Sequence, residues 1–142
     1  MKMKVMANQN FAEVYKRRAH NVGISMWHLQ WCTKYRYKMF QQEKLRIFCE
    51  TAIRECCSRN RIEIIALNVQ PDHVHLVSSL PRGMTDAKAL QLLKGFTSFL
   101  LFKIVPDFRK RYPKGHLWSQ SSFSATVGYT ELEDVVDYVK NQ

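Results

Sequence analysis

Two histidines separated by one residue, His73 and His75, are the best candidates for metal ligands in this sequence. They belong to an apolar run, 73–79, that has the composition of a β-strand. Alternate side chains of a strand point to the same face, so the two imidazoles are expected side by side. Paired imidazoles on a rigid strand suit a divalent metal ion. The spacing therefore predicts a metal site, and two histidines that merely lie on a sheet are the alternative.

Tyr138 and Gln142 are four residues apart in a segment with helical periodicity, and they therefore share one face of the helix. That face lies beside an apolar stripe, which consists of Leu132, Val135, Val136 and Val139. If the helix packs on strand 73–79, the amide oxygen of Gln142 can join the metal site. Tyr138 can then present its hydroxyl to a phosphate on the same ion. Taken singly, a packing tyrosine and a frayed terminal glutamine are the alternatives.

Four segments have the composition of β-strands. The first, 24–33, is rich in aromatic and apolar residues. The next two, 61–69 and 73–79, flank a Gln-Pro-Asp turn, and this arrangement predicts a hairpin. The last strand is expected over 117–127. The histidine pair thus lies at the start of the third strand.

Helical spacing of apolar residues predicts helices over 42–59 and from Thr85–Asp86 to about residue 104. Thr130 and Glu133 fit a capping box at the start of the last helix. The order is therefore βαββαβ followed by a helix. It predicts an α+β, ferredoxin-like antiparallel sheet with helices on one face, plus a C-terminal helix that carries the tyrosine.

The chain has 142 residues and a net charge of +10, because 22 Lys and Arg outnumber 12 Asp and Glu. This length favours one domain with its own core, which we place at 21–142 after a basic lead-in at 1–20. Strong positive charge favours a polyanionic partner, and a merely basic protein is the alternative. No apolar run approaches the ~20 residues that span a bilayer, and no Gly-rich phosphate loop is present. We therefore expect no membrane and no nucleotide cofactor.

The four cysteines form no CxxC pair, which argues against a zinc ribbon. Cys49 and Cys56 lie seven residues apart on one face of the helix expected over 42–59. Their placement indicates small core side chains in a reduced, intracellular protein.

Basic and aromatic residues along the chain fit a single nucleic-acid strand. Phosphates attract Lys and Arg, whereas unstacked bases stack on aromatic rings. The candidate phosphate contacts are Lys34, Arg36, Arg82, Arg109, Lys110, Arg111 and Lys114, and the candidate stacking platforms are Trp118 and Phe123. For each residue alone, a solvated charge or a core ring is the alternative.

Several blocks of the sequence resemble one protein family. Pro71-Asp-His-Val-His-Leu is similar to the His-hydrophobic-His motif of HUH endonucleases. Tyr138-Val-Lys-Asn-Gln is similar to the Tyr-x-x-x-Gln motif of their single-tyrosine branch, the small insertion-sequence transposases of the TnpA type. The further blocks are 31–36, 117–123 and 126–128. The resemblance covers residues 15–142, although 119–124 is richer in serine than the family version.

The resemblance implies a metal-dependent transposase that cleaves and rejoins single-stranded DNA at insertion-sequence ends. Tyr138 would attack the scissile phosphate and form a 5′-phosphotyrosine, with His73, His75 and Gln142 as metal ligands. Rejoining repeats the step with another 3′-hydroxyl, so no nucleotide cofactor is needed. The substrate chemistry implies Mg²⁺ or Mn²⁺, whereas the two histidines by themselves suit Mn²⁺ or Zn²⁺ better.

The same resemblance implies DNA with hairpin ends as substrate, a prokaryotic cytoplasm and a homodimer. In the family the tyrosine helix completes the partner's metal site. We therefore expect His73 and His75 from one chain and Tyr138, with or without Gln142, from the other; an intrachain site is the alternative. A βαββαβ sheet leaves edges open to pairing, and the apolar strand 24–33 is unlike a guarded edge.

Other functions fit part of the sequence. A domesticated relative that acts on repeated chromosomal hairpins would carry the same residues. A non-catalytic ferredoxin-like nucleic-acid-binding module explains the charge and the fold, but not the joint spacing of the histidine pair, Tyr138 and Gln142. A histidine-triad hydrolase is set aside, because position 77 is Val.

Overall fold

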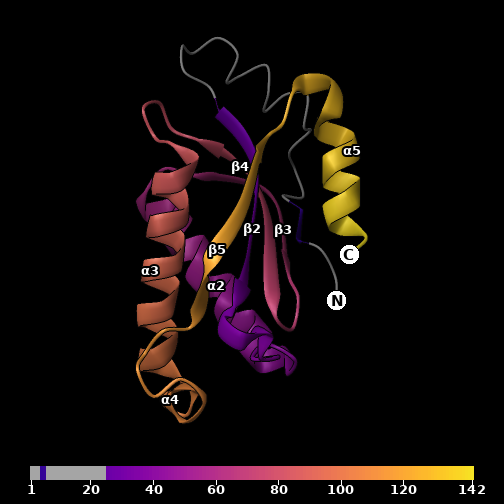
Figure 1. Ribbon diagram of the computed structural model, residues 1–142. Coiled ribbons are helices and arrows are strands. Elements are labelled where there is room, and N and C mark those ends of the chain that lie inside the picture. Colours follow the sequence, from indigo (N-terminus) through magenta and orange to yellow (C-terminus); the bar gives the residue numbers. More distant parts are fainter. Residues whose placement is uncertain (1–3, 6–24) are drawn as a thin grey trace.

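The computed structural model describes residues 4–5 and 25–142. Its centre is an antiparallel sheet, and helices pack against both faces of the sheet (Figure 1). Apart from the two residues of β1, the basic lead-in expected at 1–20 lies outside the described residues. The elements are β1 (Lys4–Val5), β2 (Ser25–Thr33), the 3₁₀ helix η1 (Lys34–Arg36), α2 (Glu43–Arg59), β3 (Glu63–Val69), β4 (His73–Leu80), α3 (Asp86–Ile104), α4 (Phe108–Arg111), β5 (Trp118–Thr126) and α5 (Tyr129–Lys140).

The strand order in the sheet is β1-β3-β4-β2-β5, and every neighbouring pair is antiparallel. Without the short β1, this is the strand order of a ferredoxin-like fold, and the predicted α+β class is confirmed. The expected hairpin is formed by β3 and β4, and Gln70 N–H donates to the carbonyl of His73 at 2.8 Å to close its turn.

β2 is an interior strand, so the expectation that segment 24–33 offers an open edge is wrong. It pairs with β4 on one side and with β5 on the other. Its aromatic and apolar residues are explained by cover on both faces of the sheet: Leu29 and Trp31 are buried against α2 and α3, whereas Met26 is buried on the opposite face. On this side of the sheet the outer strand is β5.

The sheet separates two apolar cores. The larger core lies between the sheet and helices α2 and α3, and its largest fully buried side chains include Trp31, Phe40 and Ile53. The smaller core lies under α5, on the opposite face, and consists of Met26, Ile65, Ala66, Val77, Val127, Leu132, Val136 and Val139. Full burial of each Val or Leu stabilises the fold by about 1.5–3 kcal/mol. The apolar stripe predicted for the last helix thus docks α5 on β3 and β4 (Figure 1).

The first residue of α3 agrees with the sequence-based prediction, whereas the first residue of α5 differs from it. The side-chain oxygen of Thr85 accepts a hydrogen bond from the backbone N–H of Lys88 at 3.1 Å, so Thr85 is the N-cap that was expected. The N-cap of α5 is Gly128, two residues before Thr130, so Thr130 cannot be the capping residue of a capping box. The helix therefore begins directly after β5.

Three of the four cysteines are buried, as expected for small core side chains, and all four are free thiols. Burial raises the pKa of Cys57 to about 12 and raises the pKa of Cys49 well above its ordinary value.

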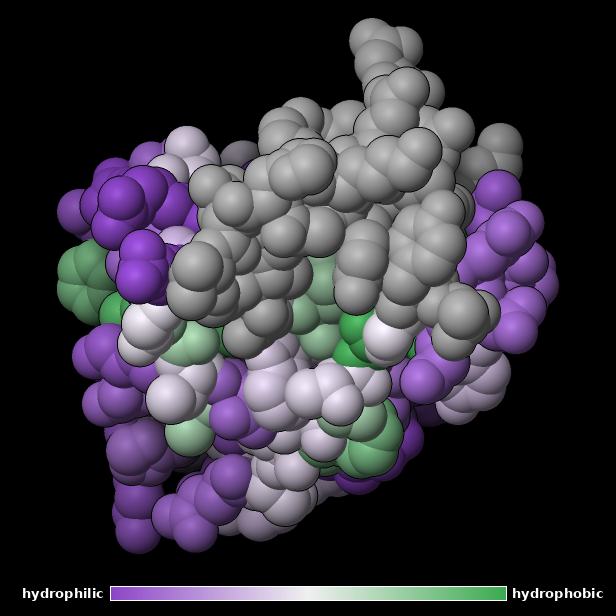
Figure 2. Space-filling view, turned by 90° about the horizontal axis from the view of Figure 1, so that it is seen from above, coloured by the Kyte–Doolittle hydropathy of each residue, from purple (hydrophilic) through white to green (hydrophobic). Residues whose placement is uncertain are grey.

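Among the described residues, no helix is both long enough and apolar enough to cross a membrane. Seen from above, hydrophilic residues lie on both sides of the described surface, with small hydrophobic areas between them (Figure 2).

Candidate active site

His73 and His75 lie side by side at the start of β4, as the strand spacing predicts. Their ring centroids are 5.0 Å apart and the ring planes are nearly perpendicular, at 79°. The His75 residue is only 1% exposed, whereas the His73 side chain is 19% exposed. The pair therefore has one buried member and one member that solvent can reach.

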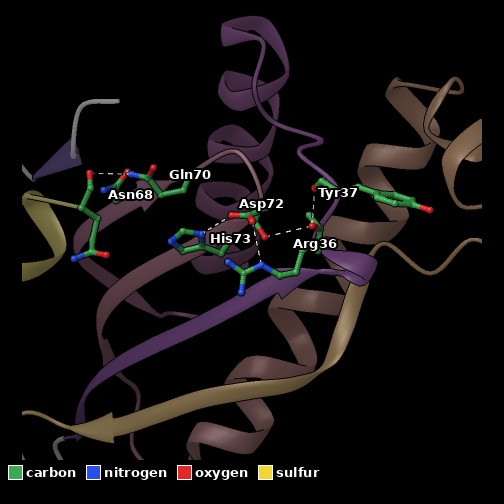
Figure 3. A network of polar contacts seen from close by, with 8 residues as sticks. Arg36, Tyr37, Asn68, Gln70, Asp72 and His73 are labelled. Atoms are coloured by element: carbon green, nitrogen blue, oxygen red, sulfur yellow. Dashed lines mark hydrogen bonds and ion pairs between the residues drawn. The ribbon is translucent and has the colours of Figure 1, made fainter.

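The Nδ1 atom of each histidine is already engaged by a neighbour. Nδ1 of His73 is 2.7 Å from Oδ1 of Asp72, and Oδ2 of the same carboxylate accepts from Nε of Arg36 at 3.0 Å (Figure 3). Nδ1 of His75 is 3.1 Å from Nε2 of His28, which lies on β2. Since a carboxylate only accepts, the proton of neutral His73 is on Nδ1. These contacts leave Nε2 of both histidines for a ligand.

Electrostatics keep the buried histidine neutral. Burial, and then the charges of His73 and His28, lower the pKa of His75 to about 4, and the nearby Gln142 side chain opposes the shift. In the part of the chain that the structure describes, Nε2 of His75 has no hydrogen-bond partner although it is buried. A buried ring nitrogen without a partner is costly, and a bound cation would satisfy it.

The neighbouring carboxylate stays ionised. Burial acts to raise the pKa of Asp72, but the hydrogen bonds from His73 and Arg36 hold it below its usual value. Asp72 can therefore orient His73 by a charge-assisted hydrogen bond at neutral pH.

Helix α5 brings Tyr138 to the histidine pair within one chain, and Gln142 follows two residues after the end of the helix. The Tyr138 ring centroid is 6.1 Å from that of His75 and 6.2 Å from that of His28. Tyr138 is 55% exposed, so its hydroxyl is accessible to a substrate. The amide nitrogen of Gln142 donates to the carbonyl of Tyr138 at 3.2 Å, and the amide oxygen is then the atom available for a cation.

Two amides from β3 and the turn after it hold the end of α5. Nδ2 of the fully buried Asn68 donates to the carbonyl of Val139 at 3.0 Å. Nε2 of Gln70 donates to the carbonyl of Gln142 at 3.2 Å and to Oδ1 of Asn68 at 3.0 Å (Figure 3). The last carbonyls of a helix have no partner within the helix. This amide clamp, Asn68 and Gln70, satisfies two carbonyls at this end of the chain and fixes the end of α5 against the sheet.

The donor set fits a divalent ion. Two imidazole nitrogens and one amide oxygen suit Mn²⁺ or another first-row metal, with open positions for oxygen atoms of a substrate. The described ranges contain no group of three or more His, Cys, Asp or Glu side chains that could hold a metal by themselves. Gln142 and a substrate would therefore have to complete the coordination of an ion on His73 and His75.

The expected DNA contacts are spread over the molecule. Arg36 lies next to the site through Asp72, and Phe123 lies on β5 with its ring centroid 5.5 Å from that of His28. Lys34 belongs to η1, directly after β2. Farther from the histidines, Arg82 follows β4 at its other end, and the basic residues of α4 and the following loop are Arg109, Lys110, Arg111 and Lys114.

Trp118 is a core residue, so the expectation of a stacking platform there is wrong. It is 7% exposed, its Nε1 donates to Oγ1 of Thr97 at 2.9 Å, and its ring contacts Trp31 edge to face at 6.0 Å. The ring is covered on the α3 side of the sheet and cannot stack on a base. Phe123, which is 49% exposed, keeps its candidate role.

Sequence reasoning missed His28 and the amide clamp. The signal for both was a polar residue inside an apolar strand: His28 between Trp27 and Leu29, and Asn68 between Leu67 and Val69. Such residues are rarely buried without a partner. Their partners lie on other elements, which local periodicity does not reveal.

A ferredoxin-like sheet with an exposed tyrosine on the helix beside a histidine pair defines a single-tyrosine transposase of the TnpA type. The chain belongs to the IS200-like transposases, whose family model matches residues 21–142. Proteins of this family act in DNA transposition. The family thus agrees with the resemblance noted in the sequence.

Similar proteins support this assignment. The ISDra2 transposase TnpA of Deinococcus radiodurans is 28% identical over 116 residues, which cover 82% of each chain. The transposase for insertion sequence element IS200 of Salmonella typhimurium is 27% identical over 127 residues, 89% of this chain and 82% of that protein.

Solved structures agree on the fold. A crystal structure of a putative transposase from Deinococcus radiodurans superposes with a TM-score of 0.69 at 27% identity, covering 85% of this chain and 92% of that one. A REP-associated tyrosine transposase bound to a REP hairpin gives a TM-score of 0.59 at 16% identity, covering 81% and 64% of the two chains.

Proposed function

We propose that this transposase cleaves and rejoins single-stranded DNA through a covalent bond between Tyr138 and a 5′-phosphate, with a divalent ion on His73, His75 and Gln142. The observation that carries the proposal is the buried Nε2 of His75, which makes no hydrogen bond of good geometry among the described residues, on a ring whose centroid is 6.1 Å from that of Tyr138. Membership of the IS200-like family supports the reaction class.

In the proposed step, the hydroxyl oxygen of Tyr138 attacks the scissile phosphorus and loses its proton. The bond from phosphorus to the 3′ oxygen breaks, and that oxygen gains a proton as a free 3′-hydroxyl. Attack of another 3′-hydroxyl on the phosphotyrosine reverses these changes and releases Tyr138. One phosphodiester bond is exchanged for another, so the reaction needs no nucleotide cofactor.

A phenol is a weak nucleophile at neutral pH, and the site must therefore activate the phosphate or the hydroxyl. A divalent ion, Mg²⁺ or Mn²⁺, would polarise a phosphoryl oxygen and orient the phosphate for attack. The protein would hold the ion through Nε2 of His73, Nε2 of His75 and Oε1 of Gln142. Asp72 fixes the His73 ring, and the amide clamp fixes the helix that carries the nucleophile.

Single-stranded DNA with hairpin ends is the proposed substrate. The exposed ring of Phe123 near the site can stack on an unpaired base. Arg36, which forms an ion pair with Asp72, has an exposed side chain that can contact a phosphate. The net charge of +10 favours any polyanion. The bound hairpin of the REP-associated transposase motivates the hairpin, since that protein shares the fold.

A homodimer remains part of the proposal. One chain brings Tyr138 to its own histidine pair, so an active site within one chain is geometrically possible. The smaller core and the amide clamp are the contacts that would have to be remade if α5 docked on a partner. Mixed dimers test this: one chain carries His73→Ala and His75→Ala, and the other carries Tyr138→Phe. Sites completed by the partner would give an adduct on the chain without histidines, and inactive mixed dimers would contradict shared sites.

The experiment that tests the function is an adduct assay. Single-stranded element ends, labelled at the 3′ end, are incubated with the protein and Mn²⁺ and run on a denaturing gel. We expect a slow-migrating protein–DNA band that depends on Mn²⁺, on Tyr138 and on His73. An adduct that forms in excess chelator would contradict the metal role, and equal cleavage of a perfect duplex would contradict the preference for single strands.

A further inference from the structure

His28 is a buried histidine that the proposed reaction does not use. It lies on interior strand β2 and is 7% exposed. In the register of the sheet it faces Val77, while Gln30 faces His75, so His28 and His75 are diagonal neighbours on the α5 side. Their rings stack at 24° with centroids 5.4 Å apart, and Nε2 of His28 is 3.1 Å from Nδ1 of His75.

Only one arrangement of protons in this pair is compatible with a metal ligand. A neutral imidazole has one N–H and one lone pair. If Nε2 of His75 is to bind an ion, its lone pair must be on Nε2 and its proton on Nδ1. That N–H then points at Nε2 of His28, which must accept the hydrogen bond through its lone pair. The proton of neutral His28 is therefore on its own Nδ1.

We propose that His28 is a positioning residue that holds His75 with its proton on Nδ1 and its Nε2 lone pair turned toward the metal site. This inference rests on the proposed metal role of His75. His28 does not touch the ion; it acts through the His75 ring. The arrangement parallels that of His73, whose Nδ1 is held by Asp72. The two ligand rings are therefore oriented by two different acceptors, a carboxylate and a neutral imidazole.

The surroundings of His28 keep its ring in place as an acceptor. His28 is 7% exposed, and its Nε2 lies within hydrogen-bond distance of Nδ1 of His75, at 3.1 Å, so it can accept a hydrogen bond from that N–H. Its ring is also packed edge to face against Phe123 and Tyr138, with centroids 5.5 and 6.2 Å away. These contacts restrict rotation of the His28 ring and keep its Nε2 aimed at His75.

The alternative is that His28 only fills space between β5 and α5, and substitutions can separate the two roles. His28→Gln keeps an acceptor oxygen at a similar reach, whereas His28→Leu keeps apolar bulk and removes the acceptor. A matched control is His116→Leu, because His116 is an exposed histidine in the loop before β5. Orienting neighbours of ligand histidines change metal affinity by roughly 10- to 100-fold when they are lost.

The test combines NMR with metal binding. Long-range ¹H–¹⁵N spectra of the metal-free, unaltered protein should assign the proton of His75 to Nδ1 and that of His28 to Nδ1. Mn²⁺ titration, followed by electron paramagnetic resonance, should give an affinity about 10- to 100-fold weaker for His28→Leu than for the unaltered protein. His28→Gln should recover most of this loss, and His116→Leu should bind like the unaltered protein.

The outcomes separate this inference from the proposed function. A His75 proton on Nε2 in the unaltered protein would overturn the role of His28, whether or not the variants fold. Unchanged Mn²⁺ affinity in folded His28→Leu would do the same while leaving the metal site intact. Absence of Mn²⁺ binding by the unaltered protein would overturn the metal site, and the positioning role with it.

Discussion

The side-chain amide of Asn68 donates to the main-chain carbonyl of Val139 at 3.0 Å and links β3 to the helix that carries Tyr138. Asn68 is fully buried and its Oδ1 accepts from Gln70, so both ends of the amide are used. The position of the tyrosine thus depends on a polar contact between the sheet and the end of α5, in addition to apolar packing.

Asn68→Leu is expected to destabilise the fold by about 1–3 kcal/mol, because the Val139 carbonyl loses a buried hydrogen bond and keeps only a longer one, from the backbone N–H of Gln142 at 3.4 Å. The loss should be visible in urea denaturation, and amide exchange should accelerate mainly in α5. Gln91→Ala removes an exposed amide from α3 and serves as the control, with an expected change of less than ~0.5 kcal/mol. Equal exchange in α5 for Asn68→Leu and the unaltered protein would contradict the clamp.

Tyr138→Phe should abolish the covalent adduct and leave folding and DNA binding nearly unchanged. Phenylalanine preserves the ring that contacts His75 and His28, and only the hydroxyl is lost. Tyr35→Phe is the control, since Tyr35 is another exposed tyrosine. An adduct of full yield in Tyr138→Phe, seen on a denaturing gel, would show that another residue is the nucleophile.

Asp72→Asn should weaken Mn²⁺ binding by roughly 10- to 100-fold, because it removes the charged acceptor that orients His73. Isothermal titration calorimetry measures the change. Asp107→Asn is a matched control: Asp107 forms an exposed ion pair with Lys110 at 3.5 Å, far from β4 in the chain. If both variants bind Mn²⁺ equally well, the orientation of His73 does not depend on Asp72.

Phe123→Ala should affect DNA binding and not stability, whereas Trp118→Ala should mainly affect stability. Loss of exposed Phe123 should weaken binding of single-stranded DNA by about 1–3 kcal/mol and leave stability nearly unchanged. Loss of buried Trp118 should destabilise the fold by about 3–5 kcal/mol. Fluorescence anisotropy and thermal unfolding separate the two effects. A stable Trp118→Ala protein with weak DNA binding would mean that Trp118 contacts DNA after all.

Thiol alkylation should follow burial. Cys49 and Cys57 are buried and have raised pKa values, so few of these thiols are ionised at pH 8, and a reagent reaches them only when the fold opens. Half-buried Cys32 should react first with iodoacetamide, as peptide mass spectrometry can show. Reaction should become faster at Cys57 as pH rises toward 12. Similar rates for Cys49 and Cys32 in the native protein would contradict this order.

Patterns within one segment predicted the order of elements and the paired faces of the two histidines, since strand periodicity fixes which side chains share a face. Contacts between segments were not predictable in this way. The diagonal approach of His28 to His75 depends on the register of β2 against β4. The burial of Trp118 depends on α3, which covers it, and an aromatic residue near a basic segment suits a core and a DNA surface equally well.

The separation of the apolar core into two parts has a consequence for motion. β4 contributes side chains to both cores, whereas the described side chains of α5 contribute only to the smaller one. Detachment of α5 would uncover Ile65 and Val77 but leave the packing of Trp31, Phe40 and Ile53 untouched. Local opening of this kind costs less free energy than global unfolding. If the amide clamp also opened, the helix with the tyrosine could leave and return while both histidines stayed on an intact strand.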